Sequence, residues 1–151
     1  MAELKERLRA DLNTAMRARD QVRMRTLRMA LTSITNEEVA GTAARDLTDD
    51  EIVKVLTREA RKRREAAEAF SAAGRSDQAA AERAEGEVLA DYLPAQLSDD
   101  ELATLVDAAI AETGASGMAS LGQVMKTVTP RVAGRADGAR VAAEVRRRLS
   151  S

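Results

Sequence analysis

Apolar residues recur at the spacing of an α-helix along almost the whole chain, and this pattern limits the possible folds more than any other feature. Leu4, Leu8, Leu12 and Met16 follow one another every fourth residue, so a helix over about residues 2–17 would carry them on one line. The same periodicity continues at Met24, Leu27, Leu31 and Ile34, at Ile52, Leu56, Ala60, Ala67 and Phe70, and at Leu102, Leu105, Val106, Ala109 and Ile110. An all-α protein is therefore predicted.

Polar residues mark where these helices are expected to begin and end. Asp20 is a predicted N-cap, and residues 48–51 and 98–101 each match a capping box, in which Thr or Ser is followed three residues later by Glu. The acidic residues of these two motifs favour the positive end of a helix dipole, so helix caps are a better interpretation than metal ligands. The glycines expected to end helices are Gly41, Gly74 and Gly114.

Pro94 is expected to close the fourth helix, because the residue before a proline is pushed away from the α region. We place the domain boundary here. Residues 1–93 are predicted to form an elongated N-terminal domain of about four helices, and residues 94–97 a linker. Residues 98–151 are predicted to form a small three-helix bundle, which at this size is marginal for independent stability and would gain from docking on the first half.

The stretch from Leu121 to Leu149 is the most specific part of the sequence. Its first part is predicted to be an amphipathic helix that Pro130 interrupts, and its last part a helix with Val141 and Val145 on its apolar face. Gly134 and Gly138 are expected to bracket a tight turn between these helices.

This turn also holds Arg135 and Asp137, and two interpretations of it remain open. Asp137 can cap the last helix, or the backbone N–H groups of the turn can bind an anion. The turn lacks the Lys-Ser/Thr ending of a nucleotide-binding P-loop, so an NTPase is not indicated.

The chain contains neither cysteine nor histidine, and this excludes several classes of site. Disulfides, thiolate catalysis, Cys-ligated zinc and serine–histidine nucleophile systems all need residues that are missing. No apolar run approaches the roughly 20 residues of a membrane-spanning helix, and the N-terminal residues are too charged for a secretory signal. We expect a soluble cytoplasmic protein without a cofactor, a metal or a membrane partner.

The formal net charge of −1 conceals a strong segregation of charge along the chain. Residues 1–28 carry eight basic and four acidic side chains, residues 76–113 carry one basic and ten acidic, and residues 114–151 carry seven basic and two acidic. Such complementary segments can pair within one molecule or between partners, including in a head-to-tail dimer.

Basic residues flank the predicted turn and are the candidate nucleic-acid contacts. Arginine is well shaped to bind phosphate, and no aromatic residue is interleaved for base stacking, so recognition would depend on shape and phosphate. The candidates are Lys126, Arg131, Arg135 and Arg140. The residues expected to shape the motif are Pro130, Gly134, Asp137 and Gly138.

Several short motifs occur in an order and spacing that are specific as a set. They are AMRARD and TLRMAL within Ala15–Leu31, LTDDE at Leu47–Glu51, REARKRREAAEAF, AGRSD at Ala73–Asp77, YLPAQLSDDEL at Tyr92–Leu102, and GQVMK with VAGRADG within Gly122–Gly138. With these motifs the chain resembles the GatB/YqeY family. These are small stand-alone proteins of the YqeY type, related to the tail region of the GatB component of the glutamine-dependent tRNA amidotransferase.

The resemblance implies a two-part helical fold and a connection with tRNA. In the amidotransferase the corresponding tail is held to help engage the tRNA, whereas amide transfer takes place in a separate large domain with ATP and magnesium. Nothing in these 151 residues resembles that domain. The family label of carbon–nitrogen ligase with glutamine as amido-N-donor is therefore not expected as an activity of this chain alone. The residues that match the tail motif are Lys126, Pro130, Arg131, Gly134, Arg135, Asp137 and Gly138.

Three functions are compatible with these observations. The leading hypothesis is a tRNA-associated accessory or binding protein. The alternative is a protein-interaction module that docks on another enzyme, such as a translation-related protein, or on a second copy of itself. The third is an amidotransferase-type enzyme, which would need a further protein component, since the chain shows no nucleophile or general base.

Overall fold

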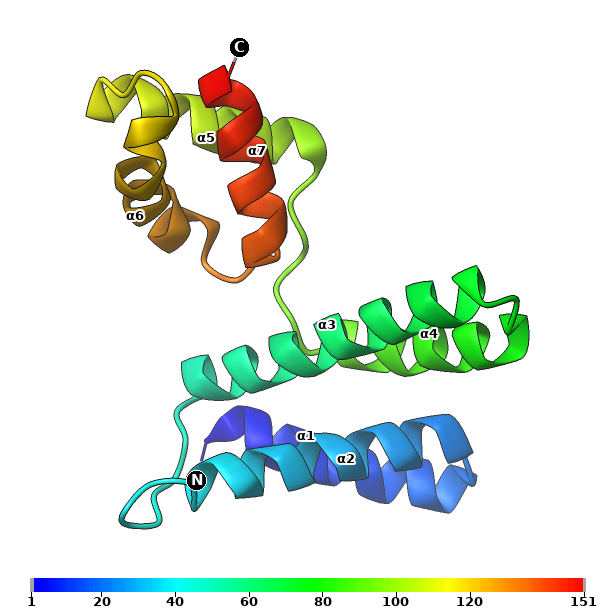
Figure 1. Ribbon diagram of the computed structural model, residues 1–151. Helices are drawn as coiled ribbons and strands as arrows, with labels where there is room; N and C mark the ends of the chain where they lie inside the picture. Colours follow the sequence, from blue (N-terminus) through cyan, green and yellow to red (C-terminus); the bar gives the residue numbers. More distant parts are fainter. Residues whose placement is uncertain (1, 151) are drawn as a thin grey trace. The chain divides into compact units, whose positions relative to one another are not determined.

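The computed structural model describes residues 2–150, which form an all-α protein as predicted (Figure 1). Within these residues no strand occurs, and no helix is long and apolar enough to cross a membrane. The α-helices are α1 (Glu3–Ala18), α2 (Gln21–Glu38), α3 (Asp49–Ala72), α4 (Ser76–Ala90), α5 (Asp99–Thr113), α6 (Leu121–Val132) and α7 (Gly138–Ser150). A short 3₁₀ helix, η1 (Met118–Ser120), precedes α6.

The chain divides into two compact units, one up to Leu93 and the other from Pro94 onward. In the first unit α1 and α2 run antiparallel, as do α3 and α4 (Figure 1). The two hairpins are packed together mainly by contacts of α2 with α3 and α4. The fully buried side chains between them are Leu8, Leu27, Ile34, Ile52, Leu56 and Leu89.

The second unit has its own hydrophobic core. Helix α5 packs on α6 and α7, α6 packs on α7, and η1 contacts both α6 and α7. Val106 of α5, Val124 and Val128 of α6 and Val145 of α7 are completely buried where these helices meet. The periodicity of valine and leucine in α6 and α7 thus produces the faces that build this core.

The predicted helix caps are present. The Asp20 side chain accepts a hydrogen bond from the backbone N–H of Arg23, and Thr48 and Ser98 each form a complete capping box. Gly74 has a φ of +77° after the end of α3, where its N–H and that of Arg75 bond to carbonyls of the last helical turn. This left-handed conformation suits glycine, which has no Cβ to clash.

The apolar line of α1 does not stay buried to the end of the helix. Met16, which the sequence places on one line with Leu8 and Leu12, is 44% exposed. Each step of four residues rotates the side chain by about 40°, so the line that is buried at Leu8 has turned away at Met16, and Ala15 is buried instead. Helix α2 ends at Glu38 with Val39 as its C-cap, close to the end near Val39 that the sequence predicts, and Gly41 follows two residues later.

The prediction that Pro130 interrupts α6 is wrong. The helix passes through Pro130 and continues to Val132. A proline removes one backbone hydrogen bond and crowds the carbonyl four residues earlier, and here only two helical residues follow it. The helix ends instead at Ala133, which has a φ of 50° and is followed by Gly134 with a φ of 78°. Two consecutive left-handed residues therefore form the break between α6 and α7.

Candidate nucleic-acid interface

The turn between α6 and α7 is fixed by backbone hydrogen bonds inside the C-terminal unit. The N–H of Arg135 bonds to the carbonyl of Val132 at 3.0 Å, and the N–H of Leu97 bonds to the carbonyl of Arg135 at 2.7 Å. Ala136, in the middle of the turn, is buried in the core. The turn is therefore attached to the segment that leads into α5.

Asp137 occupies the position of an N-cap for α7. Its Oδ1 accepts a hydrogen bond from the N–H of Ala139 at 3.3 Å, and its carbonyl accepts one from Val141 at 3.0 Å. Gly138 is the first residue of α7, and no neighbouring atom would contact a Cβ there. Of the two interpretations of this turn, the helix cap is the one that the hydrogen bonds support.

Arg140 of α7 bridges two elements of the unit. One guanidinium nitrogen donates to the carbonyl of Leu97 at 2.8 Å, and another lies 2.7 Å from Oδ1 of Asp99 at the start of α5. Arg135 lies near the same end of α5. The pKa of Glu101 is lowered chiefly by hydrogen bonds from Ser98 and, to a smaller extent, by the charge of Arg135.

Arg131 pairs with Glu112 at the other end of α5. The hydrogen bond that Arg131 donates to the carboxylate of Glu112 raises the pKa of the Arg131 guanidinium. Asp99 and Glu112 are about 20 Å apart along the axis of α5, at 1.5 Å per residue. The four candidate cations therefore do not form one cluster, because Arg135 and Arg140 lie near the beginning of α5 and Arg131 near its end.

The carboxylates of α5 face the arginines of α6 and α7. In addition to the pairs at Asp99 and Glu112, Asp107 lies 3.3 Å from Arg148, which also pairs with Glu144. The pKa of Glu144 is lowered mainly by a hydrogen bond from Arg147 and, to a smaller extent, by one from Arg148. Much of the charge that is segregated along the sequence is thus paired within the C-terminal unit.

Acidic residues in and just after α4 are paired in the same way within the N-terminal unit. Glu85 lies 2.8 Å from Arg25 of α2 and 3.1 Å from Arg63 of α3, and Asp91 lies 3.6 Å from Arg23. The side chains of Arg63 and Glu85, both in the α3–α4 hairpin, are only 17% and 14% exposed, and Arg25 joins this cluster from the other hairpin.

Lys126 and Arg146 differ from the other cations of this unit. Both are exposed, Lys126 on α6 and Arg146 on α7, and neither forms an ion pair or hydrogen bond with any other residue in the range 2–150. Arg146 was not among the predicted contacts. Its sequence neighbours Arg147 and Arg148 lie three and four residues after Glu144 and pair with it, whereas Arg146 lies only two residues after Glu144 and faces away from it.

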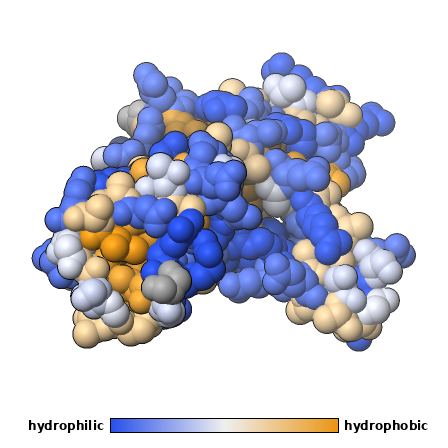
Figure 2. All heavy atoms as spheres, turned by 90° about the horizontal axis from the view of Figure 1, so that it is seen from above, coloured by the Kyte–Doolittle hydropathy of each residue, from blue (hydrophilic) through white to orange (hydrophobic). Residues whose placement is uncertain are grey.

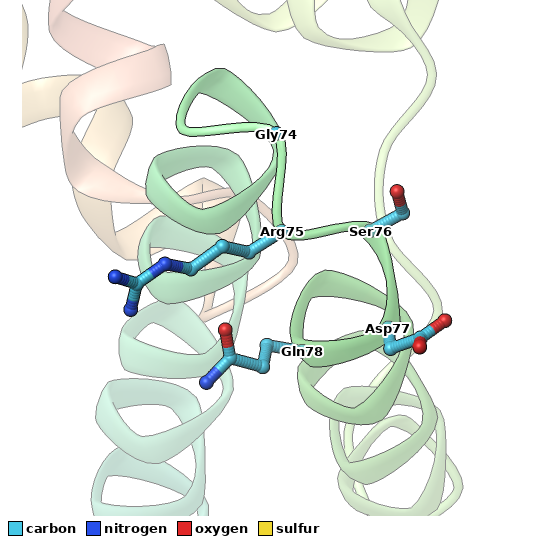
Figure 3. A pocket seen from close by; sticks show the side chains of 5 residues that line it. All are labelled: Gly74, Arg75, Ser76, Asp77 and Gln78. Atoms are coloured by element: carbon cyan, nitrogen blue, oxygen red, sulfur yellow. The ribbon is translucent and has the colours of Figure 1, made fainter.

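A surface hollow in the N-terminal unit is lined by Gly74 and the four residues after it, from the turn between α3 and α4 and the first turn of α4 (Figure 3). The side chains of Arg75 and Gln78 extend to one side of this turn, whereas Ser76 and Asp77 point to the other (Figure 3). The polar groups do not converge on a common point. Within residues 2–150 there is also no group of three acidic side chains that could hold a metal ion.

A family model described as Yqey-like protein matches residues 5–149, which span both units and every helix. No curated protein matches the chain.

Proposed function

Because the chain belongs to the YqeY-like protein family, we propose that it is a tRNA-associated accessory protein that binds RNA with its C-terminal unit. The family match over nearly the whole chain carries this proposal, since the resemblance relates such proteins to the tail of the tRNA amidotransferase. Without cysteine and histidine the chain can form neither a thiolate nucleophile nor a serine–histidine pair, which favours a binding role.

The ion pair between Arg131 and Glu112 is compatible with this role, because it is easily exchanged. Its two side chains are 38% and 55% exposed. Exposed pairs of this kind contribute about 0–1 kcal/mol, so a phosphate can replace the carboxylate of Glu112 at little cost. Arginine also binds phosphate with two parallel hydrogen bonds, which compensates for the lost partner.

The proposal assigns different roles to the four candidate residues. Lys126 and Arg131 are the phosphate contacts on α6, since both are exposed. Arg135 is half-buried and makes a long hydrogen bond from Nε to the carbonyl of Val132, so it is a weaker contact. Arg140 holds the start of α5 against α7 through Leu97 and Asp99, and its role is structural.

The first experiment measures binding of purified tRNA to the full chain over a series of salt concentrations. If a few phosphates are neutralised, the logarithm of the affinity falls linearly with the logarithm of salt concentration, with a slope close to one for each contact. Binding that is absent at low salt, or that does not depend on salt, would contradict the proposal.

The second experiment uses a pair of substitutions with opposite expected effects. Arg131→Ala should weaken tRNA binding severalfold and reduce the salt slope by about one. Glu112→Gln should strengthen binding, because it removes the carboxylate that competes with phosphate for Arg131. Arg28→Ala is the control, since Arg28 is exposed on α2 and forms no ion pair within residues 2–150. Equal effects of Arg131→Ala and Arg28→Ala would show that the proposed contacts are wrong.

A further inference from the structure

A large apolar side chain is exposed in the C-terminal unit where η1 leads into α6. Met118 of η1 is 46% exposed, although its neighbours Leu121 and Met125 pack against the core. Figure 2 shows a mostly hydrophilic face, on which strongly apolar residues gather at the lower left and appear in smaller spots elsewhere. An exposed apolar group with a polar surround is typical of an interaction site.

Met118 is bordered by the end of α7 and by an uncrowded position in the first turn of α6. The Oγ of Ser150 lies 3.6 Å from the Sδ of Met118, so the end of α7 borders η1. A Cβ added at Gly122, in the first turn of α6, would meet no atom within 4 Å. We refer to Met118, Leu121, Gly122, Met125 and Ser150 together as the Met118 surface.

Two unpaired cations lie beside this surface. Arg146 is four residues before Ser150 on α7, and Lys126 is four residues after Gly122 on α6. Residues four apart share one face of a helix, so both cations lie one turn away from the Met118 surface. Four arginines of the same unit are paired with carboxylates, namely Arg131, Arg140, Arg147 and Arg148.

The geometry points to the Met118 surface as the docking site for an acidic amphipathic helix of a partner protein. The partner places one or two bulky apolar side chains on Met118, Leu121 and Met125, and its Asp or Glu residues pair with Lys126 and Arg146. Methionine side chains are flexible and polarisable, and therefore adapt to the shape of a docked helix. An apolar floor with charged residues at its edge is the arrangement by which grooves bind amphipathic helices.

Docking of a partner helix at the Met118 surface goes beyond the proposed tRNA binding and does not depend on it. Nucleic acid offers phosphate and bases, and the Met118 surface has neither an aromatic platform nor a row of cations to receive them. Lys126 is shared by the two proposed sites. A helix bound at the Met118 surface is therefore expected to compete with tRNA.

The test titrates the full chain with a synthetic amphipathic helix that carries leucine on one face and glutamate on the other. Backbone amide NMR shifts should change at residues 118–126 and 146–150, and binding should weaken as salt is added. A second peptide, with lysine in place of every glutamate, should bind at least tenfold more weakly. Equal binding of the two peptides, or shift changes elsewhere only, would overturn the proposal.

Met118→Ser should weaken binding of the acidic peptide about tenfold, as expected for a central apolar anchor. Met16→Ser is the matched control, because Met16 is 44% exposed in the N-terminal unit, almost as much as Met118. Arg146→Glu should weaken binding and reduce its salt dependence. Circular dichroism of each variant establishes that the fold is intact, and equal effects of the two methionine substitutions would refute the site.

Two variants separate this proposal from tRNA binding. Met118→Ser should leave the affinity for tRNA unchanged, and Arg131→Ala should leave the affinity for the acidic peptide unchanged. If each of the two substitutions weakens binding of both tRNA and the acidic peptide, a distinct docking surface does not exist. Concentration-dependent shifts at residues 118–126 without peptide would identify a second copy of the chain as the occupant and overturn the proposal.

Discussion

At the scale of single residues, the buried ion pair between Lys5 and Glu38 is the charged contact most removed from water. The Nζ of Lys5 lies 2.7 Å and 2.9 Å from the two carboxylate oxygens of Glu38, and the side chains are only 7% and 11% exposed. The hydrogen bond from Lys5 is the main cause of the lowered pKa of Glu38. A buried charge is tolerated only while its partner is present.

Lys5→Met should therefore lower the free energy of unfolding by about 2 kcal/mol, because it leaves a buried carboxylate without its donor. The double variant Lys5→Met with Glu38→Leu should recover most of this loss, since it removes both charges. Urea denaturation measures both effects. Lys54→Met is the control, because Lys54 is exposed and unpaired within residues 2–150. A loss no larger than that of the control would contradict the expectation.

Tyr92 gives a second prediction at this scale. Its hydroxyl donates to Oδ2 of Asp11 at 2.5 Å, and the guanidinium of Arg7 lies 4.6 Å from the ring centroid. Burial, followed by the hydrogen bond to Asp11, raises the pKa of Tyr92 from 10.0 to about 12. The neutral phenol is favoured in the folded state, so its contribution to stability is complete below pH 10 and is lost as the pH rises through about 12.

Because Tyr92 is the only tyrosine and tryptophan is absent, the absorbance of tyrosinate reports this group alone. The folded protein should titrate at higher pH than the protein in denaturant. Asp11→Asn should lower the pKa of Tyr92 in the folded protein only part of the way toward 10.0, because the ring stays buried. Identical titration curves in the folded and unfolded states would disprove the assignment.

At the scale of elements, the capping box of α3 links a sequence motif to pH-dependent stability. Glu51 accepts hydrogen bonds from Arg45 and from the backbone N–H of Thr48, at 2.9 Å and 3.2 Å. These hydrogen bonds lower the pKa of Glu51 from 4.5 to about 2, and the bond from Arg45 has the largest effect. The stability that they contribute is complete above pH 4.5 and is lost as the pH falls toward 2.

Glu51→Gln should therefore lower Tm by a few degrees at neutral pH, and this difference should shrink as the pH falls from 4.5 toward 2. Thermal melts of both proteins at several pH values provide the measurement. Asp50→Asn is the control in the same helical turn, because Asp50 has no part in the cap. A difference between Glu51→Gln and the original chain that does not change with pH would argue against this account.

The sequence predicts the helix caps but not the partners of the arginines. The caps at Asp20 and Thr48 depend on residues three positions away, so their signals are contained in the local sequence. The partner of Arg131 is 19 residues away and that of Arg140 is 43 residues away. These pairs depend on how α5, α6 and α7 cross, which periodicity does not specify. The helices were therefore predictable, whereas the roles of the individual arginines were not.

At the scale of the whole molecule, each unit has a hydrophobic core of its own. Within residues 2–150 one cluster joins buried residues from α1 to Tyr92, and the other joins residues from Leu97 to α7. The two clusters share no residue. A cavity made in one core should therefore loosen the helices of that unit and leave the other unit largely unaffected.

Val145→Ala should destabilise the C-terminal unit by about 2 kcal/mol, because Val145 is completely buried and its truncation leaves a cavity. Amide hydrogen exchange should become faster in α5, α6 and α7 and remain nearly unchanged in α1 to α4. Leu27→Ala, at an equally buried position of the N-terminal unit, should produce the reverse pattern. Exchange that increases equally in both units would show that they unfold together.

The pairing of α5 carboxylates with arginines of α6 and α7 also limits how the sequence can diverge. Glu112 and Arg131 are joined by an ion pair, and so are Asp107 and Arg148. A single exchange of one charge places like charges together, whereas a concerted exchange of both restores attraction. In the evolution of such a unit these positions are expected to change as pairs, whereas Lys126 and Arg146, which have no partner within residues 2–150, are expected to change singly unless the proposed contacts restrain them.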